Sequence, residues 1–408
     1  MKKMQNEEFL ILRTKYSHPF AFTEPSVRFR DAGEAPELWI DTVDAEAKDV
    51  SRLREQPDVL SVVPPLPICL VAPKVRFTPS PPASPHTAWG VQAVGAEKST
   101  YNAGAIVVAV LDTGIDASHE AFVGMKIEER DFTNSGPGDS NGHGTHCAGT
   151  IFGRPINNVR YSVAPTVGRV LIGKVLDKNG IGTTRSLLEA IVWALTKEAH
   201  IITMSLGIDF PGYVKALTVR GIPVELATSK ALQGYRDNIR MFDRLAGLVR
   251  SGGAEGRGAL LLAAAGNASK RDGDPAYELA VEPPAAAEGI VSVGALERIG
   301  NDISKMKVAA FSNNFPAVAA PGVDILSAKS GGGYIEMSGT SMATPHVAGV
   351  AALWAAKMIE EDGYLEVEGL AHRVIGGARR LPGIDRSDVG AGLVQAPIPN
   401  AGSSGEAK

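Results

Sequence analysis

The sequence predicts an α/β protein whose main domain holds a parallel β-sheet between two layers of helices. Short, unbroken apolar runs alternate with longer helical segments along most of the chain, which is the pattern of a parallel sheet covered on both faces. The chain has 408 residues, of which 44% are hydrophobic. A large core with a second, smaller domain is therefore expected.

The elements of the main domain follow from this alternation. Apolar runs too short for a helix are interpreted as strands, and longer runs with apolar residues on one face or on all faces are interpreted as helices. Strands are expected at 106–111, 169–175, 200–206, 260–265 and 290–293, and helices around His143 and at 186–198, 237–249 and 342–358.

The chain divides by composition into four parts. In the first part, strands at 9–12, 38–43 and 58–63 and a charged amphipathic helix at 45–55 indicate a small α+β domain. A proline-rich linker follows, for which an extended conformation is expected, and the last residues form a polar tail that is expected to be disordered. The four parts are 1–77, the linker 78–87, the main domain 88–398 and the tail 399–408.

Charge and cysteine content exclude several classes of protein. The formal net charge is −4 with the signs interspersed, which indicates no nucleic-acid partner and no membrane partner, and no apolar run is long enough to span a bilayer. Cys69 and Cys147 fall in different predicted domains, so no structural disulfide is expected. The N-terminus lacks the apolar stretch of a secretory signal, which favours a cytoplasmic protein; a secreted protein whose signal was removed is the alternative.

One serine is notable for its position. In 338–349, small residues form a tight turn that leads into a helix whose residues are all apolar or small from 347 to 356. This arrangement holds the Ser341 hydroxyl at the helix N-terminus, where unpaired N–H groups and the helix dipole favour an oxyanion. An ordinary serine cap on a core helix is the alternative.

A serine hydroxyl becomes a good nucleophile when a base takes its proton and a carboxylate orients that base. Asp112 ends the apolar run 107–112 and precedes a glycine turn, so a buried strand would present its carboxylate at the carboxyl edge of the sheet. His143 lies in the glycine-containing segment 141–149. These two residues are the candidate carboxylate and base.

With Asp, His and Ser in this order along the chain, the three segments resemble the subtilisin-like serine proteases, the subtilases. The resemblance implies an endopeptidase that cleaves polypeptides through an acyl-enzyme, with Asp112 as the orienting carboxylate, His143 as general base and acid, and Ser341 as the nucleophile. Residues 263–267 resemble the segment whose asparagine, here Asn267, donates to the oxyanion together with the Ser341 N–H. This mechanism requires no cofactor and no metal ligand, although calcium stabilises many members of the family as a structural ion.

Substrate contacts follow from the same resemblance. One wall of the S1 pocket, with a strand that pairs with the substrate backbone, is expected at 205–207, and the opposite wall at 264–266. Counting back without gaps from 293–295 places Glu282 at the floor of this pocket, where a carboxylate would favour Lys or Arg at P1; a broad or apolar preference is the alternative. The expected substrate-binding residues are Ser205, Leu206, Gly207, Ala264, Ala265, Gly266 and Glu282.

The N-terminal part, 1–77, resembles the inhibitory propeptide of subtilases. The resemblance implies that this domain inhibits its own catalytic domain with its C-terminal segment in the substrate cleft, and that any self-cleavage falls between 79 and 86. An unrelated accessory domain is the alternative. Residues 208–258 are longer than the usual connection in the family, and they could form either a lid or recognition surface beside the cleft or an exposed helical hairpin.

Alternatives exist for the motifs themselves. His143 and His146 are three residues apart and could bind zinc from one helix face, although no third ligand motif follows. A binding protein on an inactive protease fold would be expected to lack at least one member of the catalytic set. A latent zymogen would keep the whole set but stay blocked by its N-terminal domain. Asp272 and Asp274 flank a glycine in a turn that suggests calcium but is more typical of a solvated turn.

Overall fold

The computed structural model describes residues 7–15, 38–71, 74–76, 86–251, 258–300 and 302–399. The strands of its main sheet are β7 (Val107–Asp112), β8 (Lys126–Asp131), β10 (Arg169–Lys174), β12 (Ile201–Met204), β14 (Leu260–Ala264), β15 (Val291–Ile299), β16 (Asp302–Val308) and β17 (Val318–Pro321). Seven of them follow one another in the order β16-β15-β14-β12-β7-β10-β8, and β17 pairs with β15. All neighbouring strands are parallel except the edge pair of β15 and β16.

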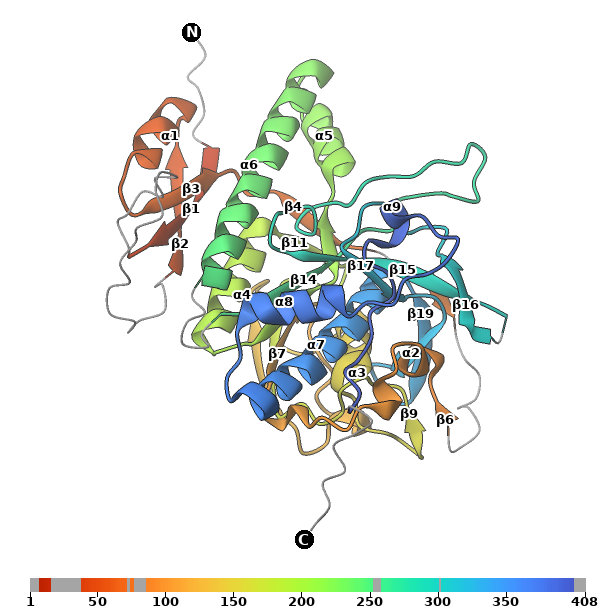
Figure 1. Cartoon of the computed structure of the whole chain (residues 1–408). Helices are drawn as coiled ribbons and strands as arrows, with labels where there is room; N and C mark the ends of the chain where they lie inside the picture. The colour runs from red at the N-terminus through yellow and green to blue at the C-terminus, as the bar shows by residue number, and fades with distance from the viewer. Residues whose placement is uncertain are drawn as a thin grey trace, which may run out of the picture.

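Helices cover both faces of this sheet (Figure 1). The main ones are α3 (His143–Phe152), α4 (Thr184–Thr196), α6 (Val224–Ser251), α7 (Thr340–Asp362) and α8 (Val367–Gly376). Because side chains alternate along a strand, Val108 and Val110 of β7 belong to a core that includes α3, α7 and α8, whereas Ala109 and Leu111 belong to a core that includes α4 and α6. The predicted fold, a parallel sheet between helices, is confirmed.

The edges of the sheet are where the sequence prediction failed. β8 and β16 lie at the two edges, and most of their residues are exposed or half-buried. A strand buried on both faces has a continuous apolar sequence, whereas an edge strand contains charged residues that resemble those of a loop. The apolar-run criterion therefore found the central strands and missed these two, and it also missed β17, which is buried but only four residues long.

The N-terminal residues form a separate sheet with the order β2-β1-β3. Its elements are β1 (Glu7–Thr14), β2 (Leu38–Ala45), α1 (Ala47–Arg54) and β3 (Val59–Val63). Alternate residues of β1 face opposite sides, so Phe9 and Ile11 belong to a small core with Val50 of α1, while Leu10 and Leu12 belong to the core that contains α4 and α6. Both faces of β1 are therefore covered, which explains its four consecutive apolar residues.

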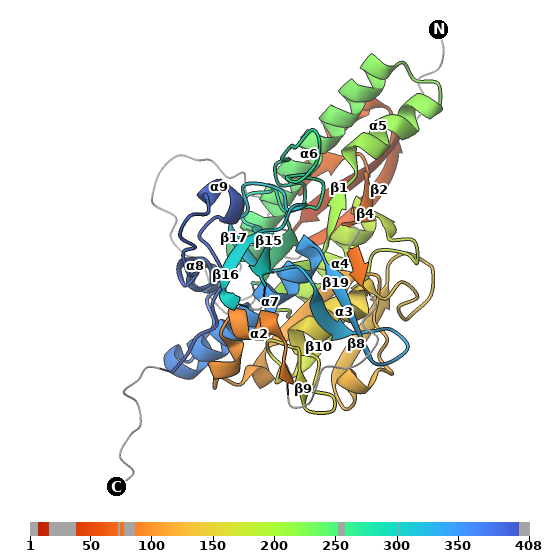
Figure 2. The same ribbon diagram turned by 90° about the vertical axis from the view of Figure 1, so that its right-hand side faces the viewer.

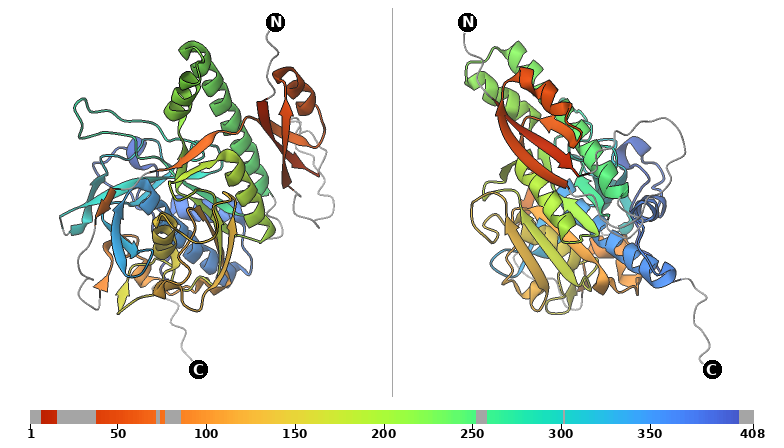
Figure 3. Two further views of the ribbon diagram at one scale, coloured as in Figure 1. Left: turned by 180° about the vertical axis from the view of Figure 1, so that it is seen from behind. Right: turned by 90° about the vertical axis from the view of Figure 1, so that its left-hand side faces the viewer.

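The long segment 208–258 contains a helical hairpin of α5 (Phe210–Val219) and α6, and α6 packs against β3 (Figure 2, Figure 3). Polar contacts reinforce this packing. Lys230 Nζ lies 2.7 Å from Glu7 Oε1, and Asn238 Nδ2 donates to the Pro64 carbonyl oxygen at 3.0 Å. The segment is helical, as in the second alternative, but it is not an exposed hairpin, because the second helix is part of the core and supports the N-terminal sheet.

The chain continues from the N-terminal sheet into the main domain as β4 (Pro67–Leu70). This strand lies between β11 (Ile181–Thr183) and β13 (Leu206–Ile208) and is antiparallel to both. Shortly afterwards β5 (Lys74–Arg76) pairs with β19 (Tyr334–Ser338), which in turn pairs with β18 (Ile325–Ala328). The connection between the two domains therefore runs as an extended chain across the main domain.

The other elements are short. They are β6 (His86–Thr87), α2 (Trp89–Ala93), β9 (Val159–Arg160), α9 (Arg386–Val389) and three turns of 3₁₀-helix at Ala96–Lys98, Ala103–Ala105 and Glu120–Phe122. Most of the predicted linker and tail, at 77–85 and 400–408, lies outside the described residues. Within the described ranges, none of the helices combines the length and the apolar character needed to cross a membrane.

The packing of β1 on the main domain predicts a large effect of Leu12→Ala. Leu12 is fully buried in the core shared with α4 and α6, so the truncation should lower the free energy of unfolding by about 2–5 kcal/mol. Chemical denaturation of the full chain measures this change. Thr42→Ala on the exposed side of β2 is the control, and equal effects of the two substitutions would contradict the packing.

Candidate active site

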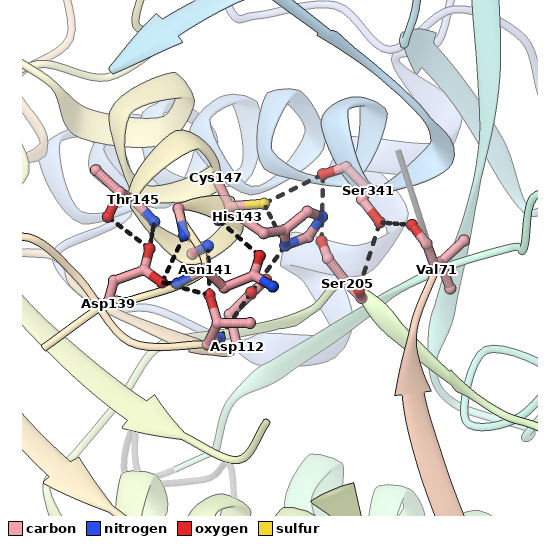
Figure 4. A network of polar contacts seen from close by, with 12 residues as sticks. Val71, Asp112, Asp139, Asn141, His143, Thr145, Cys147, Ser205 and Ser341 are labelled. Atoms are coloured by element: carbon pink, nitrogen blue, oxygen red, sulfur yellow. Dashed lines mark hydrogen bonds and ion pairs between the residues drawn. The ribbon is translucent and has the colours of Figure 1, made fainter. Parts of the chain in front are cut away.

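Asp112 and His143 meet at the carboxyl edge of the sheet (Figure 4). Asp112 is the last residue of β7 and His143 the first of α3, and Asp112 Oδ1 lies 2.8 Å from His143 Nδ1. Helix α3 can come this close because a Cβ on Gly144 would lie 2.2 Å from the Gly114 carbonyl oxygen in the turn after β7. A proton on Nδ1 that is donated to the carboxylate leaves Nε2 as the basic nitrogen. Within the described part of the chain, this buried Nε2 has no hydrogen-bond partner.

A second carboxylate, Asp139, fixes the start of α3 and was not found from the sequence. Its Oδ1 accepts hydrogen bonds from the Thr113 hydroxyl at 2.8 Å and the Gly142 N–H at 2.8 Å, and its Oδ2 accepts from the N–H and hydroxyl of Thr145 at 2.9 and 2.6 Å. Asp139 thereby ties the turn after Asp112 to the helix that begins at His143. Its only sequence signal is an aspartate in a glycine-containing loop, which is typical of solvated turns.

Ser341 is the second residue of α7 and is fully buried. Its Oγ lies 3.3 Å from the carbonyl oxygens of Val71 and Ser205, and its own carbonyl oxygen accepts from the Ser205 hydroxyl at 3.2 Å. Figure 4 shows the His143 imidazole between Asp112 and this serine. The described contacts include no hydrogen bond between Ser341 Oγ and His143 Nε2, and such bonds often form only when the reacting groups engage.

Asn267 lies just beyond the end of β14 and faces the Val71 carbonyl group. Its Oδ1 accepts two hydrogen bonds from Thr340, one from the N–H and one from the hydroxyl, each at 2.8 Å. Because these donors fix the amide orientation, Nδ2 is directed at the Val71 carbonyl oxygen, 3.4 Å away. The Val71 oxygen therefore lies between the Asn267 amide and the Ser341 hydroxyl.

The peptide carbonyl held at the serine is thus part of the chain itself. The Leu70 N–H donates to the Gly180 carbonyl oxygen at 2.7 Å, and this register brings Val71 to Ser341. The sequence predicts self-cleavage between 79 and 86, most of which lies outside the described residues. Among the described residues, the carbonyl group that lies at Ser341 is that of Val71, and the pairing of β4 with β11 and β13 sets its position.

The residues predicted for one wall of the substrate pocket lie beside this segment. In β13, Leu206 pairs with Leu70 and Gly207 with Cys69. The residues predicted for the opposite wall follow β14, where the Ala265 carbonyl oxygen accepts from the Asn313 side chain at 3.2 Å. The predicted set thus lies on two segments. Ser205, Leu206 and Gly207 lie at β13, which pairs with the self-segment, residues 67–71, and Ala264, Ala265 and Gly266 lead to Asn267, whose amide reaches the Val71 carbonyl oxygen.

Glu282 lies between these two walls. A Cβ on Gly207 would lie 3.0 Å from Glu282 Oε1, and a Cβ on Gly266 would lie 2.4 Å from it. Burial raises the pKa of Glu282 to about 7, with a further increase from the negative charge of Asp209. The carboxylate therefore lies next to Gly207 and Gly266, and its place at the floor of a substrate pocket stays a prediction.

The zinc alternative is disfavoured by the chemistry of the nearby groups. His146 Nε2 lies 2.9 Å from the Ile325 carbonyl oxygen, so this nitrogen already has a hydrogen-bond partner. Ligand-type atoms of Asp112, His143 and Cys147 do lie within 4.8 Å of one another. Burial and the charge of Asp112 raise the Cys147 pKa well above its usual range, which keeps the thiol protonated and opposes metal binding.

The turn at 272–274 gives no further support to a calcium site. Asp272 and Asp274 are both exposed. Among the residues that the structure describes, neither belongs to a group of three potential ligands. Calcium is therefore an expectation from the resemblance alone.

These observations define a class of protein, a three-layer α/β domain that gathers Asp, His and Ser at one edge of its sheet. The subtilase family model matches residues 103–389, and the chain belongs to the subtilase family. It is 35% identical to the thermostable alkaline protease of Halalkalibacterium halodurans over 65% of this chain and 62% of that protein. It is 36% identical to the intracellular serine protease of Paenibacillus polymyxa over 61% of this chain and 66% of that protein. The chain spans less than two thirds of the length of these two curated relatives.

Cys69 can report whether β4 occupies its position. Burial raises the pKa of Cys69 to about 11, with smaller contributions from the negative charges of Asp209 and Glu282. About one thiol in a thousand is therefore ionised at pH 8. In a Cys147→Ala variant, iodoacetamide should alkylate the folded chain roughly 10²-fold more slowly than the chain unfolded in guanidinium.

Mass spectrometry measures the alkylation. A variant with both Cys69→Ser and Cys147→Ala is the control and should not react. Equal rates in the folded and unfolded chains would show that β4 does not occupy its position.

Proposed function

We propose that this chain is a serine endopeptidase that hydrolyses peptide bonds of proteins through Asp112, His143 and Ser341. The observation that carries the proposal is the Val71 carbonyl oxygen, 3.3 Å from Ser341 Oγ and 3.4 Å from Asn267 Nδ2. A site for acyl transfer must hold a peptide carbonyl in this way, between a nucleophile and a hydrogen-bond donor. Two relatives, a thermostable alkaline protease and an intracellular serine protease, support the same reaction.

In the first half of the reaction, His143 Nε2 takes the proton from Ser341 Oγ while Oγ attacks the carbonyl carbon. Asp112 accepts the Nδ1–H hydrogen bond and stabilises the imidazolium that forms. The carbonyl oxygen becomes an oxyanion, which the Asn267 amide and the Ser341 N–H at the start of α7 stabilise. His143 then donates its proton to the leaving amine, and the acyl group stays on Ser341.

In the second half, water replaces the amine. His143 takes a proton from the water as the water oxygen attacks the acyl carbon, and the oxyanion forms again between the same donors. When this intermediate collapses, His143 returns the proton to Ser341, and the product leaves as a carboxylic acid that loses its remaining proton to water. His143 carries the proton transfers at the reacting atoms, so these steps require no cofactor.

The N-terminal domain acts in this proposal as an inhibitor within the same chain. β4 takes the place of a substrate, since it pairs with both β11 and β13 and brings Val71 to the nucleophile. Main-chain pairing gives such a strand its affinity. The rest of the domain is anchored on α6 and α4, for example where Arg185 Nη1 lies 3.4 Å from Glu8 Oε1. The hairpin in 208–258 then serves as the docking surface of the inhibitor.

Loss of the nucleophile tests the catalytic proposal. Ser341→Ala should reduce kcat on an unfolded protein substrate by about 10⁶, as in subtilisin without its nucleophile, because the variant cannot form the acyl-enzyme. The variant should also fail to react with a fluorophosphonate probe. Ser304→Ala, a substitution on the edge strand β16, is the control and should keep both properties. Retained hydrolysis in Ser341→Ala would overturn the proposal.

Intact mass over time tests the inhibitor proposal. The wild type should convert into fragments 1–71 and 72–408, whereas Ser341→Ala should stay whole. Leu70→Pro removes the N–H that donates to Gly180, so the self-segment should bind less tightly, and hydrolysis of an added peptide should start several-fold faster.

The matched control is Leu70→Ala, which shortens the side chain but keeps this hydrogen bond. A chain that hydrolyses the peptide at full rate while it is still whole would contradict inhibition. Cleavage at another bond would contradict the assignment of Val71.

A further inference from the structure

Glu282 places a carboxylate between two glycines on opposite walls of the cleft. Its Oε1 lies where a Cβ on Gly207 would come within 3.0 Å and a Cβ on Gly266 within 2.4 Å. The segment that carries Glu282 is fixed to both walls. The Glu282 N–H donates to the Ala265 carbonyl oxygen at 3.2 Å, and the next carbonyl oxygen accepts from the Ile208 N–H at 3.0 Å. The carboxylate is therefore held in the space between the walls by the backbone around it.

No basic side chain forms a salt bridge with this carboxylate in the part of the chain that the structure describes. The charged group that acts on it is Asp209, the N-cap of α5, which has the same sign. Two other titratable groups face it, the Cys69 thiol of β4 and the Tyr235 phenol of α6, and neither carries a positive charge. A half-buried carboxylate without a cation is costly, and a ligand that brings a cation lowers that cost.

We propose that Glu282 selects substrates with Lys or Arg at P1, the residue whose carbonyl group Ser341 attacks. This inference rests on the proposed function, since it concerns the same cleft. In the self-segment the P1 residue is Val71, because its carbonyl oxygen lies at Ser341 and Asn267. A P1 side chain enters between the two walls, where a basic group meets the carboxylate and an apolar group leaves it unpaired.

In the self-segment, an apolar P1 residue then lies where the Glu282 carboxylate favours a basic one. Val71 is buried and apolar, so the closed cleft favours the protonated form of Glu282. The pKa of Glu282 is raised to about 7 in this state, so protonation stabilises the closed cleft at low pH, and this stabilisation is lost as the pH rises through about 7. A basic P1 residue reverses the dependence, since only the ionised carboxylate attracts it.

The first test uses the full chain with Ser341→Ala, so that no cleavage occurs, and reads amide hydrogen exchange in β4 by mass spectrometry. At pH 8, Val71→Lys should slow exchange in β4 about tenfold relative to Val71→Leu, because the introduced ammonium pairs with Glu282. Glu282→Gln should abolish this difference. Glu288→Gln, an exposed position on the same segment, is the matched control and should preserve it.

The exchange test does not depend on catalytic activity. If Val71→Lys speeds exchange to the same extent with and without Glu282→Gln, the carboxylate does not recognise a basic P1 residue and the inference is overturned. If the slowing by Val71→Lys survives Glu282→Gln, another group recognises the ammonium and the inference is also overturned.

The second test uses peptides that differ only at P1. The ratio of kcat/KM for Lys over Leu should exceed about ten and should rise with pH, since any pH dependence common to the two peptides cancels in the ratio and the ionisation of Glu282 does not. Glu282→Gln should lower the ratio at least tenfold and remove its pH dependence. A preference for Leu that Glu282→Gln leaves unchanged overturns the inference while the proposed function stands. If no peptide is cleaved and no fluorophosphonate label forms, the proposed function fails. The exchange test alone then decides whether Glu282 recognises a basic residue at position 71.

Asp209→Asn tests the assignment of the titrating group. Asparagine caps helices as well as aspartate does, so the contact with the Gly212 N–H, now 2.8 Å, can persist. The substitution removes the negative charge that raises the pKa of Glu282, so the rise in the Lys-over-Leu ratio should move to lower pH. An unmoved profile would mean that Glu282 is not the titrating group, which would overturn the inference.

Discussion

The hydrogen bond between Asp112 and His143 is the contact on which the rest of the site depends. It joins the end of a strand to the start of a helix, and both side chains are buried. A buried carboxylate and imidazole are stable only when each has a partner in good geometry. The surrounding structure supplies that geometry, with Gly144 allowing close approach and Asp139 fixing the first turn of α3. Since α3 also packs against α7, the same constraint determines where Ser341 lies.

The N-terminal domain depends on the main domain for its own packing. Its independent core is small, with Phe9, Ile11, Ala45, Val50 and Val62 as the buried members, and a core of this size stabilises a domain only marginally. Leu10 and Leu12 lie on the other face and contribute to the core of the main domain. Folding of this domain and the position of β4 are therefore coupled, because Leu10 and Leu12 of β1 and Ile68 of β4 belong to the same core.

Much of the fold and of the site could be predicted from the sequence, for identifiable physical reasons. A strand buried on both faces must be apolar throughout, so β7, β12 and β14 could be predicted. The segments around Asp112, His143 and Ser341 could be recognised because each has a characteristic pattern within its own few residues. Contacts made by register could not be predicted. Nothing local to Val71 or Asp139 indicates which groups they meet, since one depends on the pairing of β4 with β11 and β13 and the other on a loop that folds back onto α3. Of the hairpin, only 237–249 within α6 was recognised and α5 was missed, because the surface that α6 packs on belongs to a distant stretch of the chain.

The position of β4 also limits what can replace it. The strand uses both of its backbone edges, one toward β11 and one toward β13. A polypeptide that enters the same groove must free both edges of an extended segment, so it cannot keep a neighbouring strand or a helix in that segment. The free energy needed to unfold that segment of the other protein would then add to the free energy cost of binding in the groove. How well a protein resists cleavage would then depend on its local unfolding equilibrium as much as on its side chains. Well-packed proteins would be poor substrates even if nothing in the cleft excluded them.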